Sequence, residues 1–325
     1  MNAIEKRIEE LHRFRPGTEP PEDHEAFWER TTREAIGSAF PSTRTETDNP
    51  MSGMKTYDVE FEGFAGTPIR GTLMLPAFLE GPYPCLLTFP GYTGGKGMPE
   101  AHARWILMGA AVFAVDVRGQ GGETGNTMDQ DFGMAKGWIT QNITDPERCY
   151  YKAIAVDCLR AAQWMSEQPE LDAGRLGVVG GSQGGGLALL VSALHERIAL
   201  TVADIPNMCN LDHGLFHSTG SLTEVADLAR RYPELLPKAL RTLSYFDMIH
   251  LGHRIKQPLL MSVGLKDTVC LPEQVFPMFH AAASEDKSLE IFPFTGHAVE
   301  AAQTRRAMEF VRDRWFRSSR AARRS

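Results

Sequence analysis

The chain has 325 residues, enough for one large α/β domain with additions or for two smaller domains. Its 42% hydrophobic and 23% charged residues are typical of a globular protein, and its net charge of −7 argues against nucleic acid as a partner. No apolar run approaches the ~20 residues of a membrane span, so we expect no membrane partner.

The N-terminus and the cysteines together predict a cytoplasmic location. Residues 1–11 form a charged amphipathic helix, and no apolar region follows them as it would in a signal peptide. Five scattered cysteines without a C-x-x-C pair indicate reduced thiols. They are Cys85, Cys149, Cys158, Cys209 and Cys270.

Residues 1–50 are predicted to be a helical extension punctuated by prolines, with its second helix at about 24–35. The sheet is then expected to begin with an antiparallel hairpin. Residues 57–63 alternate as a half-exposed strand, and residues 69–75 pair with them.

After the hairpin the strands become continuously apolar, which is typical of parallel strands covered on both faces by helices. Residues 85–89 and 111–116 are two such strands, joined by a crossover helix at 101–108. A long polar loop follows to about residue 149, and a helix is expected over 151–168.

The second half of the chain continues the alternation of strands and helices, so we predict an α/β fold with a mostly parallel central sheet. Residues 206–254 are too long for a simple connection and contain helical stretches, so we predict a cap inserted in a domain that spans 51–325. The expected strands are 175–179, 200–204, 258–264 and 289–292, and the expected helices are 185–194 and a closing helix around Met308 to Trp315. The basic C-terminal residues Arg317, Arg320, Arg323 and Arg324 favour a solvated end over an anionic-surface contact.

The pentapeptide Gly180-Gly181-Ser182-Gln183-Gly184 fits G-x-S-x-G, the nucleophile elbow of α/β-hydrolases. It lies between a predicted strand and a predicted helix, which is the context that the motif requires. The serine of such an elbow has a strained backbone, and the residues two positions away on either side must lack a Cβ. Ser182 is therefore the predicted nucleophile, and an incidental serine in a glycine-rich turn is the alternative.

A serine hydroxyl needs a base, and in this fold the chain order is serine, acid, histidine. Of ten histidines, His297 follows the last predicted strand, at the carboxyl edge where sites of such sheets lie. Asp267 ends the preceding strand and is the predicted acid, with a helix N-cap as its alternative role. Asp286 is a poorer rival because it precedes a strand.

An oxyanion hole needs two N–H donors. One is the backbone amide of Gln183, and the other is expected in the glycine-rich loop after Phe89, where we choose the amide of Tyr92. A flexible surface turn is the alternative for that loop. His213 and His217 could share a helix face, but Gly214 stands where a zinc-protease helix has Glu, so no metal and no cofactor are predicted.

Several motifs resemble the acetyl xylan esterase / cephalosporin C deacetylase family, carbohydrate esterase family seven. They are Asp116-Val117-Arg118-Gly119-Gln120-Gly121, the Gly180–Gly185 elbow, Ser262–Cys270, and Thr242–Asp247 in the cap. The resemblance implies a serine esterase that deacetylates small acetylated sugars and related acetates through Ser182, Asp267 and His297. It also implies that Arg118 and Gln120 brace the loops near the elbow, and that the chain forms a homo-oligomer.

Two positions depart from the family's pattern: Pro90 replaces a histidine before the Gly-Tyr of the oxyanion loop, and Ala298 replaces a glutamate after His297. Cleavage of a peptide, lactone or thioester bond stays open as an alternative activity. A binding module with a dead site is a further alternative, but it requires a broken triad and all three positions are filled.

Overall fold

The structure is a computed structural model that describes residues 1–131, 133–134 and 136–317. Arg320, Arg323 and Arg324 lie outside these residues. The helices are α1 Ala3–Arg13, α2 His24–Ile36, α3 Ala103–Met108, α4 Tyr150–Ser166, α5 Gln183–Leu194, α6 Leu211–His217, α7 Thr223–Arg231, α8 Leu236–Tyr245, α9 Pro272–Ala281 and α10 Ala301–Trp315. The strands are β1 Ser42–Thr47, β2 Met54–Glu62, β3 Pro68–Pro76, β4 Tyr83–Phe89, β5 Ala111–Val115, β6 Leu171–Gly181, β7 Ile198–Asp204, β8 Leu259–Gly264 and β9 Lys287–Phe292.

The described strands form one nine-stranded sheet in the order β1-β2-β3-β5-β4-β6-β7-β8-β9. The pairs from β1 to β3 and the β3–β5 pair are antiparallel, whereas all pairs from β5 through β4 to β9 are parallel. The predicted mostly parallel sheet and its opening hairpin are therefore confirmed. In the hairpin, Phe61 pairs with Ile69 across the turn.

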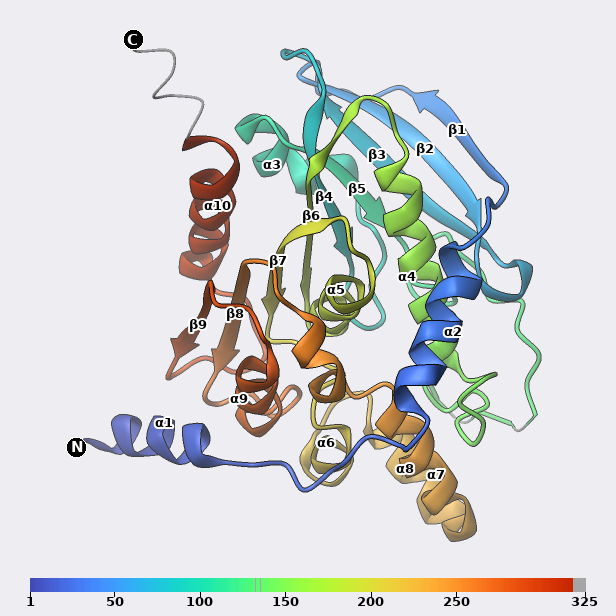
Figure 1. The fold of residues 1–325 in the computed structure, drawn as a ribbon, viewed down its shortest axis with the longest axis vertical. Coiled ribbons are helices and arrows are strands. Elements are labelled where there is room, and N and C mark those ends of the chain that lie inside the picture. Colours follow the sequence, from blue (N-terminus) through green and yellow to red (C-terminus); the bar gives the residue numbers. More distant parts are fainter. Residues whose placement is uncertain (132, 135, 318–325) are drawn as a thin grey trace.

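Helices cover both faces of the sheet (Figure 1). α3 and α10 pack on one face, where Trp105, Phe310 and Val311 join a core cluster with strand residues such as Leu200. α4, α5 and α9 pack on the other face in a larger cluster. This double covering explains why the parallel strands read as uninterrupted apolar runs.

The predicted cap between β7 and β8 contains α6, α7 and α8, and Figure 1 places these helices beyond the arrowheads of the parallel strands. The N-terminal segment reaches the same region. Trp28 of α2 is fully buried and donates its Nε1–H to the carbonyl of Tyr245 at the end of α8, at 2.9 Å. The cap is therefore packed against residues from near the start of the chain.

Strand β1 was not predicted, and it lies within residues 1–50. All six of its residues are polar and none is buried, so no apolar alternation marks it. It pairs with β2 as the edge of the sheet, where Arg44 stacks on the ring of Tyr57 at 3.9 Å. Polar side chains are common on edge strands because they discourage pairing with another chain.

No helix in the described part of the chain is long and apolar enough to cross a membrane.

Candidate active site

Ser182 occupies a sharp turn between β6 and α5, with φ 57° and ψ −121°. This positive φ is strained for a residue with a side chain. The turn closes so tightly that a Cβ on Gly180 would overlap the carbonyl oxygen of Gly184, and a Cβ on Gly184 would overlap that of Phe89. The two glycines two positions from Ser182 are thus required by close backbone approach, as the sequence analysis predicted.

The backbone of Ser182 is fixed from both sides. Its N–H donates to the carbonyl of Asp204 at 2.9 Å, and its carbonyl accepts from the N–H of Asn207 at 2.9 Å. Strain at this position persists because β7 and the segment after it over-determine the backbone. The hydroxyl is therefore held at the carboxyl end of β6.

The structure brings Ser182, His297 and Asp267 together in a hydrogen-bonded chain. Nε2 of His297 lies 3.0 Å from Oγ of Ser182, and its Nδ1 lies 2.8 Å from Oδ2 of Asp267. A serine, an imidazole and a buried carboxylate in this order can transfer the serine proton to the ring while the carboxylate stabilises the imidazolium.

The loops that carry the acid and the base touch each other. Asp267 follows β8 and is buried, whereas His297 follows β9 and is partly exposed. A Cβ on Gly264 would overlap the carbonyls of Thr295 and Gly296, so the backbones meet directly. The other oxygen of Asp267 accepts from the N–H groups of Val269 and Cys270 at 2.8 and 2.9 Å, which fixes the carboxylate.

The alternative role of Asp267 as a helix cap does not apply, since the N-cap of α9 is Leu271. Asp286 instead forms an ion pair with Arg314 of α10.

The expected oxyanion donors come from two different segments, the start of α5 and the loop after β4. Gln183 is the first residue of α5, where backbone N–H groups lack partners within the helix. Tyr92 lies in the loop after β4, and the neighbouring Gly91 approaches the elbow closely. A Cβ on Gly91 would lie 3.8 Å from that of Ser182.

Gln120 joins the two sides of this expected oxyanion hole. Its Oε1 accepts from the N–H of Thr93 at 2.8 Å, next to Tyr92. Its side chain also exchanges hydrogen bonds with that of Gln183, at 2.9 and 3.1 Å. A single amide therefore sets the spacing between the loop after β4 and the start of α5.

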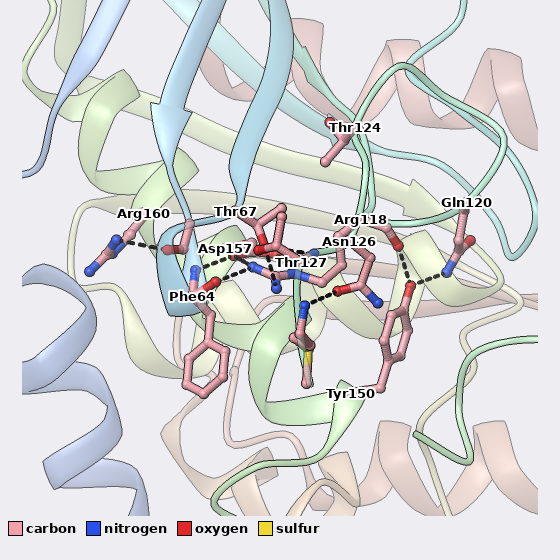
Figure 2. A network of polar contacts seen from close by, with 12 residues as sticks. Phe64, Thr67, Arg118, Gln120, Thr124, Asn126, Thr127, Tyr150, Asp157 and Arg160 are labelled. Carbon is pink, nitrogen blue, oxygen red and sulfur yellow. Dashed lines mark hydrogen bonds and ion pairs between the residues drawn. The ribbon is translucent and has the colours of Figure 1, made fainter. Parts of the chain in front are cut away.

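Arg118 is fully buried, and Figure 2 shows the polar contacts that surround it. Its guanidinium binds the carboxylate of Asp157 through two bonds of 2.6 and 2.7 Å. The hydroxyl of Tyr150 donates to the carbonyl of Arg118 at 2.6 Å and accepts from Nε2 of Gln120 at 2.9 Å. Arg118 thus contacts Gln120 through Tyr150.

Two further side chains adjoin the site and were not selected from the sequence. Sγ of Cys270 lies 3.9 Å from Oγ of Ser182, and burial raises the pKa of this thiol well above its usual range, so it stays protonated. Glu224 of α7 accepts the hydroxyl hydrogen of Tyr92. Cys270 ends the Ser262–Cys270 motif, but that motif assigned it no role. Glu224 belongs to no motif and is 132 positions from its partner, so the sequence offered no signal for its contact.

His213 and His217 lie side by side on α6, with ring centroids 4.4 Å apart. Among the residues that the structure describes, no group of three or more His, Cys, Asp or Glu side chains is arranged to hold a metal ion.

A comparison with models of known protein families identifies the family of this chain. A family model described as acetyl xylan esterase (AXE1) matches residues 1–314. The chain belongs to the acetyl xylan esterase family. The family predicted from the sequence motifs is thereby confirmed.

Solved members of the acetyl xylan esterase family superpose over nearly the whole chain. An acetyl xylan esterase from Paenibacillus sp. R4 is 33% identical with a TM-score of 0.90, and the match covers 94% of this chain and 99% of that one. Acetyl xylan esterase 1 from Thermoanaerobacterium sp. JW/SL YS485 is 29% identical with a TM-score of 0.89, over 95% and 98% of the two chains. The predicted α/β-hydrolase fold is confirmed.

Among curated proteins, the acetyl esterase Axe7A from Xylanibacter ruminicola is 25% identical over 291 residues, which are 87% of this chain. The match spans 65% of the length of that relative.

Proposed function

We propose that this chain is a serine esterase that hydrolyses small acyl esters, with acetate esters, such as acetylated sugars, as the preferred class. The chain of hydrogen bonds from Ser182 through His297 to Asp267 carries the proposal, because it ends on a strained elbow in a member of the acetyl xylan esterase family. The names of the similar proteins, which are acetyl esterases and acetyl xylan esterases, support acetate as the acyl group.

In the proposed mechanism, Nε2 of His297 removes the hydroxyl proton while Oγ of Ser182 attacks the ester carbonyl. The backbone N–H groups of Tyr92 and Gln183 stabilise the negative charge that develops on the carbonyl oxygen. The alcohol leaves with the proton from His297. Water then attacks the acyl-enzyme with His297 again as the base, which releases the acid and restores Ser182.

Gln120 and Arg118 are proposed to act at a distance from the ester. Gln120 ties Thr93 to the side chain of Gln183, so it holds the two donors of the oxyanion hole at a fixed separation. Arg118 supports Gln120 through Tyr150. Both would then stabilise the transition state by positioning rather than by contact.

The test is the reaction of the purified protein with 4-nitrophenyl acetate. We expect a burst of nitrophenol equal to the enzyme concentration when deacylation is slow, and a loss of kcat of at least about 10⁴-fold in Ser182→Ala. Undiminished turnover by that variant would overturn the proposal. A panel of acetylated sugars, longer acyl esters and lactones then defines which esters the enzyme accepts.

We also propose a cytoplasmic location, a homo-oligomeric state and a division into an extension of residues 1–50 and a hydrolase domain of 51–325 with its cap at 206–254. The five cysteines are all buried and free, which supports a reducing compartment. Light scattering coupled to size-exclusion chromatography would measure the oligomeric state.

A further inference from the structure

A carboxylate from the cap is buried directly against the loop that carries Tyr92. Glu224 lies in the first turn of α7, and only 5% of its surface is exposed. Burial raises the pKa of this carboxyl group above its ordinary value, so the position is unfavourable for an ionised glutamate unless its oxygens are well satisfied.

The partners of Glu224 are donors from two segments outside the cap. The single hydroxyl hydrogen of Tyr92 is shared between both carboxylate oxygens, which lie 2.8 and 2.9 Å from the hydroxyl oxygen, and the backbone amide of Ile139 adds a hydrogen bond. The backbone at Gly137, which has φ 66°, packs so closely on the carboxylate that a Cβ there would overlap it.

The ring of Tyr92 is restrained in other ways as well. Its hydroxyl oxygen accepts from the N–H of Trp138 at 2.9 Å, and the Trp138 ring packs edge-on against it with centroids 5.5 Å apart. At the other end of the residue, the following amide of Thr93 is held by Gln120. Tyr92 is therefore anchored at its backbone by Gln120 and at its ring tip by Glu224.

We propose that Glu224 is a positioning residue for the oxyanion hole: by holding the Tyr92 ring, it fixes the direction of the Tyr92 backbone N–H and couples the cap to catalysis. This inference rests on the proposed esterase function. A donor aimed at the developing oxyanion stabilises the transition state and not the bound ester, so its displacement lowers kcat and leaves KM nearly unchanged.

A purely structural role for Glu224, in which it only links the cap to the hydrolase domain, predicts a different result. It would lower the melting temperature, whereas the folded enzyme would retain its kcat. Two measurements on the folded variant distinguish these roles: its kinetic constants, and its affinity for a ligand that places an oxyanion in the oxyanion hole.

The experiment compares Glu224→Gln, Tyr92→Phe and the double variant with the wild type, with Asp227→Asn as the matched control. Glutamine has one acceptor oxygen, and its NH₂ group faces donors, so it cannot reproduce the hydrogen bond that Tyr92 shares between two carboxylate oxygens. Asp227 makes the same carboxylate-to-amide change one turn along α7, where it is half exposed and pairs with Arg230.

Two readouts are taken: kcat and KM with 4-nitrophenyl acetate, and the Ki of an alkyl trifluoromethyl ketone. The Oγ of Ser182 adds to the ketone carbon, the proton passes to His297, and the carbonyl oxygen becomes an oxyanion in the hole. We expect Glu224→Gln and Tyr92→Phe each to lower kcat about tenfold, less than the loss of a whole oxyanion donor, with KM nearly unchanged. Ki should rise by the same factor.

The double variant should be no slower than the slower single variant, because both changes remove one shared hydrogen bond. Wild-type kcat and Ki in folded Glu224→Gln, or an equal loss in Asp227→Asn, would overturn the inference. If Glu224→Gln does not fold, Tyr92→Phe decides, since it keeps the carboxylate.

Retained turnover in Ser182→Ala would instead mean that the proposed function fails, and the inference with it. Loss of turnover in Ser182→Ala together with unchanged kinetics in Tyr92→Phe and Glu224→Gln would overturn the inference alone.

Discussion

At the scale of single residues, the site depends on side chains that cannot be exchanged for similar ones. Arg118 illustrates this, because its planar guanidinium binds Asp157 through two parallel bonds and also donates to Thr67 and to the carbonyl of Phe64. A lysine ammonium could not satisfy this set of partners. The geometry of the guanidinium explains why an arginine stands in the Arg118-Gly119-Gln120 motif, although Arg118 is proposed to act at a distance from the ester.

Removal of this arginine should cost far more than removal of a surface one. We expect Arg118→Leu to lower the free energy of unfolding by about 3–5 kcal/mol, because Asp157 would remain buried without its partner. Arg175→Leu breaks a partly exposed pair with Asp172 and should cost at most about 1 kcal/mol. Urea unfolding of both variants measures the difference, and equal losses would contradict a special role for the buried pair.

The order of strands and helices in this fold predicts which side chains meet at the strand ends. Ser182, Asp267 and His297 each follow a parallel strand, and the structure brings them together as expected. Glu224 was not predicted, because the sequence pattern does not determine where a helix of the predicted cap packs relative to the sheet. Its contact with Tyr92 arises from tertiary packing that no periodicity encodes.

At the scale of elements, the burial of a strand determines whether its sequence pattern predicts it. The parallel strands were found because they are apolar throughout, and the opening hairpin because it alternates. Strand β1 was missed because its polar residues make an edge that faces solvent on both sides. The segment between β7 and β8 was predicted to be a cap from its length and its helical stretches, and its packing against α2 could not be predicted from local patterns.

The contact between α2 and the cap should be a measurable part of the protein's stability. Trp28 packs edge-on against Phe246, with centroids 5.5 Å apart. We expect Trp28→Ala to cost about 3–5 kcal/mol from lost packing, and Trp28→Phe about 1 kcal/mol for the lost hydrogen bond to Tyr245, beyond any change in ring packing.

Limited proteolysis would show whether the unfolding of Trp28→Ala begins in the cap. Cleavage within residues 206–254 should precede cleavage of the sheet in Trp28→Ala. Simultaneous cleavage of both regions would indicate that the cap does not open separately.

At the scale of the whole molecule, we expect stability to depend on pH through histidines that burial keeps neutral. Burial lowers the pKa of His195 and of His250 to about 4, from an ordinary value near 6.5. Between these two pH values the unfolded chain binds more protons than the folded one, so stability falls as pH falls from 6.5 to 4 and is constant in this respect above 6.5.

His195 allows this dependence to be tested. It is 4% exposed, and its Nε2 lies 3.2 Å from Oε1 of Gln163. Since one pKa unit corresponds to ~1.4 kcal/mol, His195 should lower the free energy of unfolding by about 3 kcal/mol at pH 4. His195→Gln should therefore flatten the plot of unfolding free energy against pH between 4 and 6.5, and an unchanged slope would refute the assignment.

The sheet order also has a consequence for biosynthesis. Ser182 follows β6, but its proposed base His297 follows β9, 115 positions later in the chain. Because β9 is the far edge of the parallel half, Ser182 meets His297 only when the final strand has docked. A chain still emerging from the ribosome without β9 therefore lacks this base, and we expect the proposed esterase activity to report that the last strand has docked.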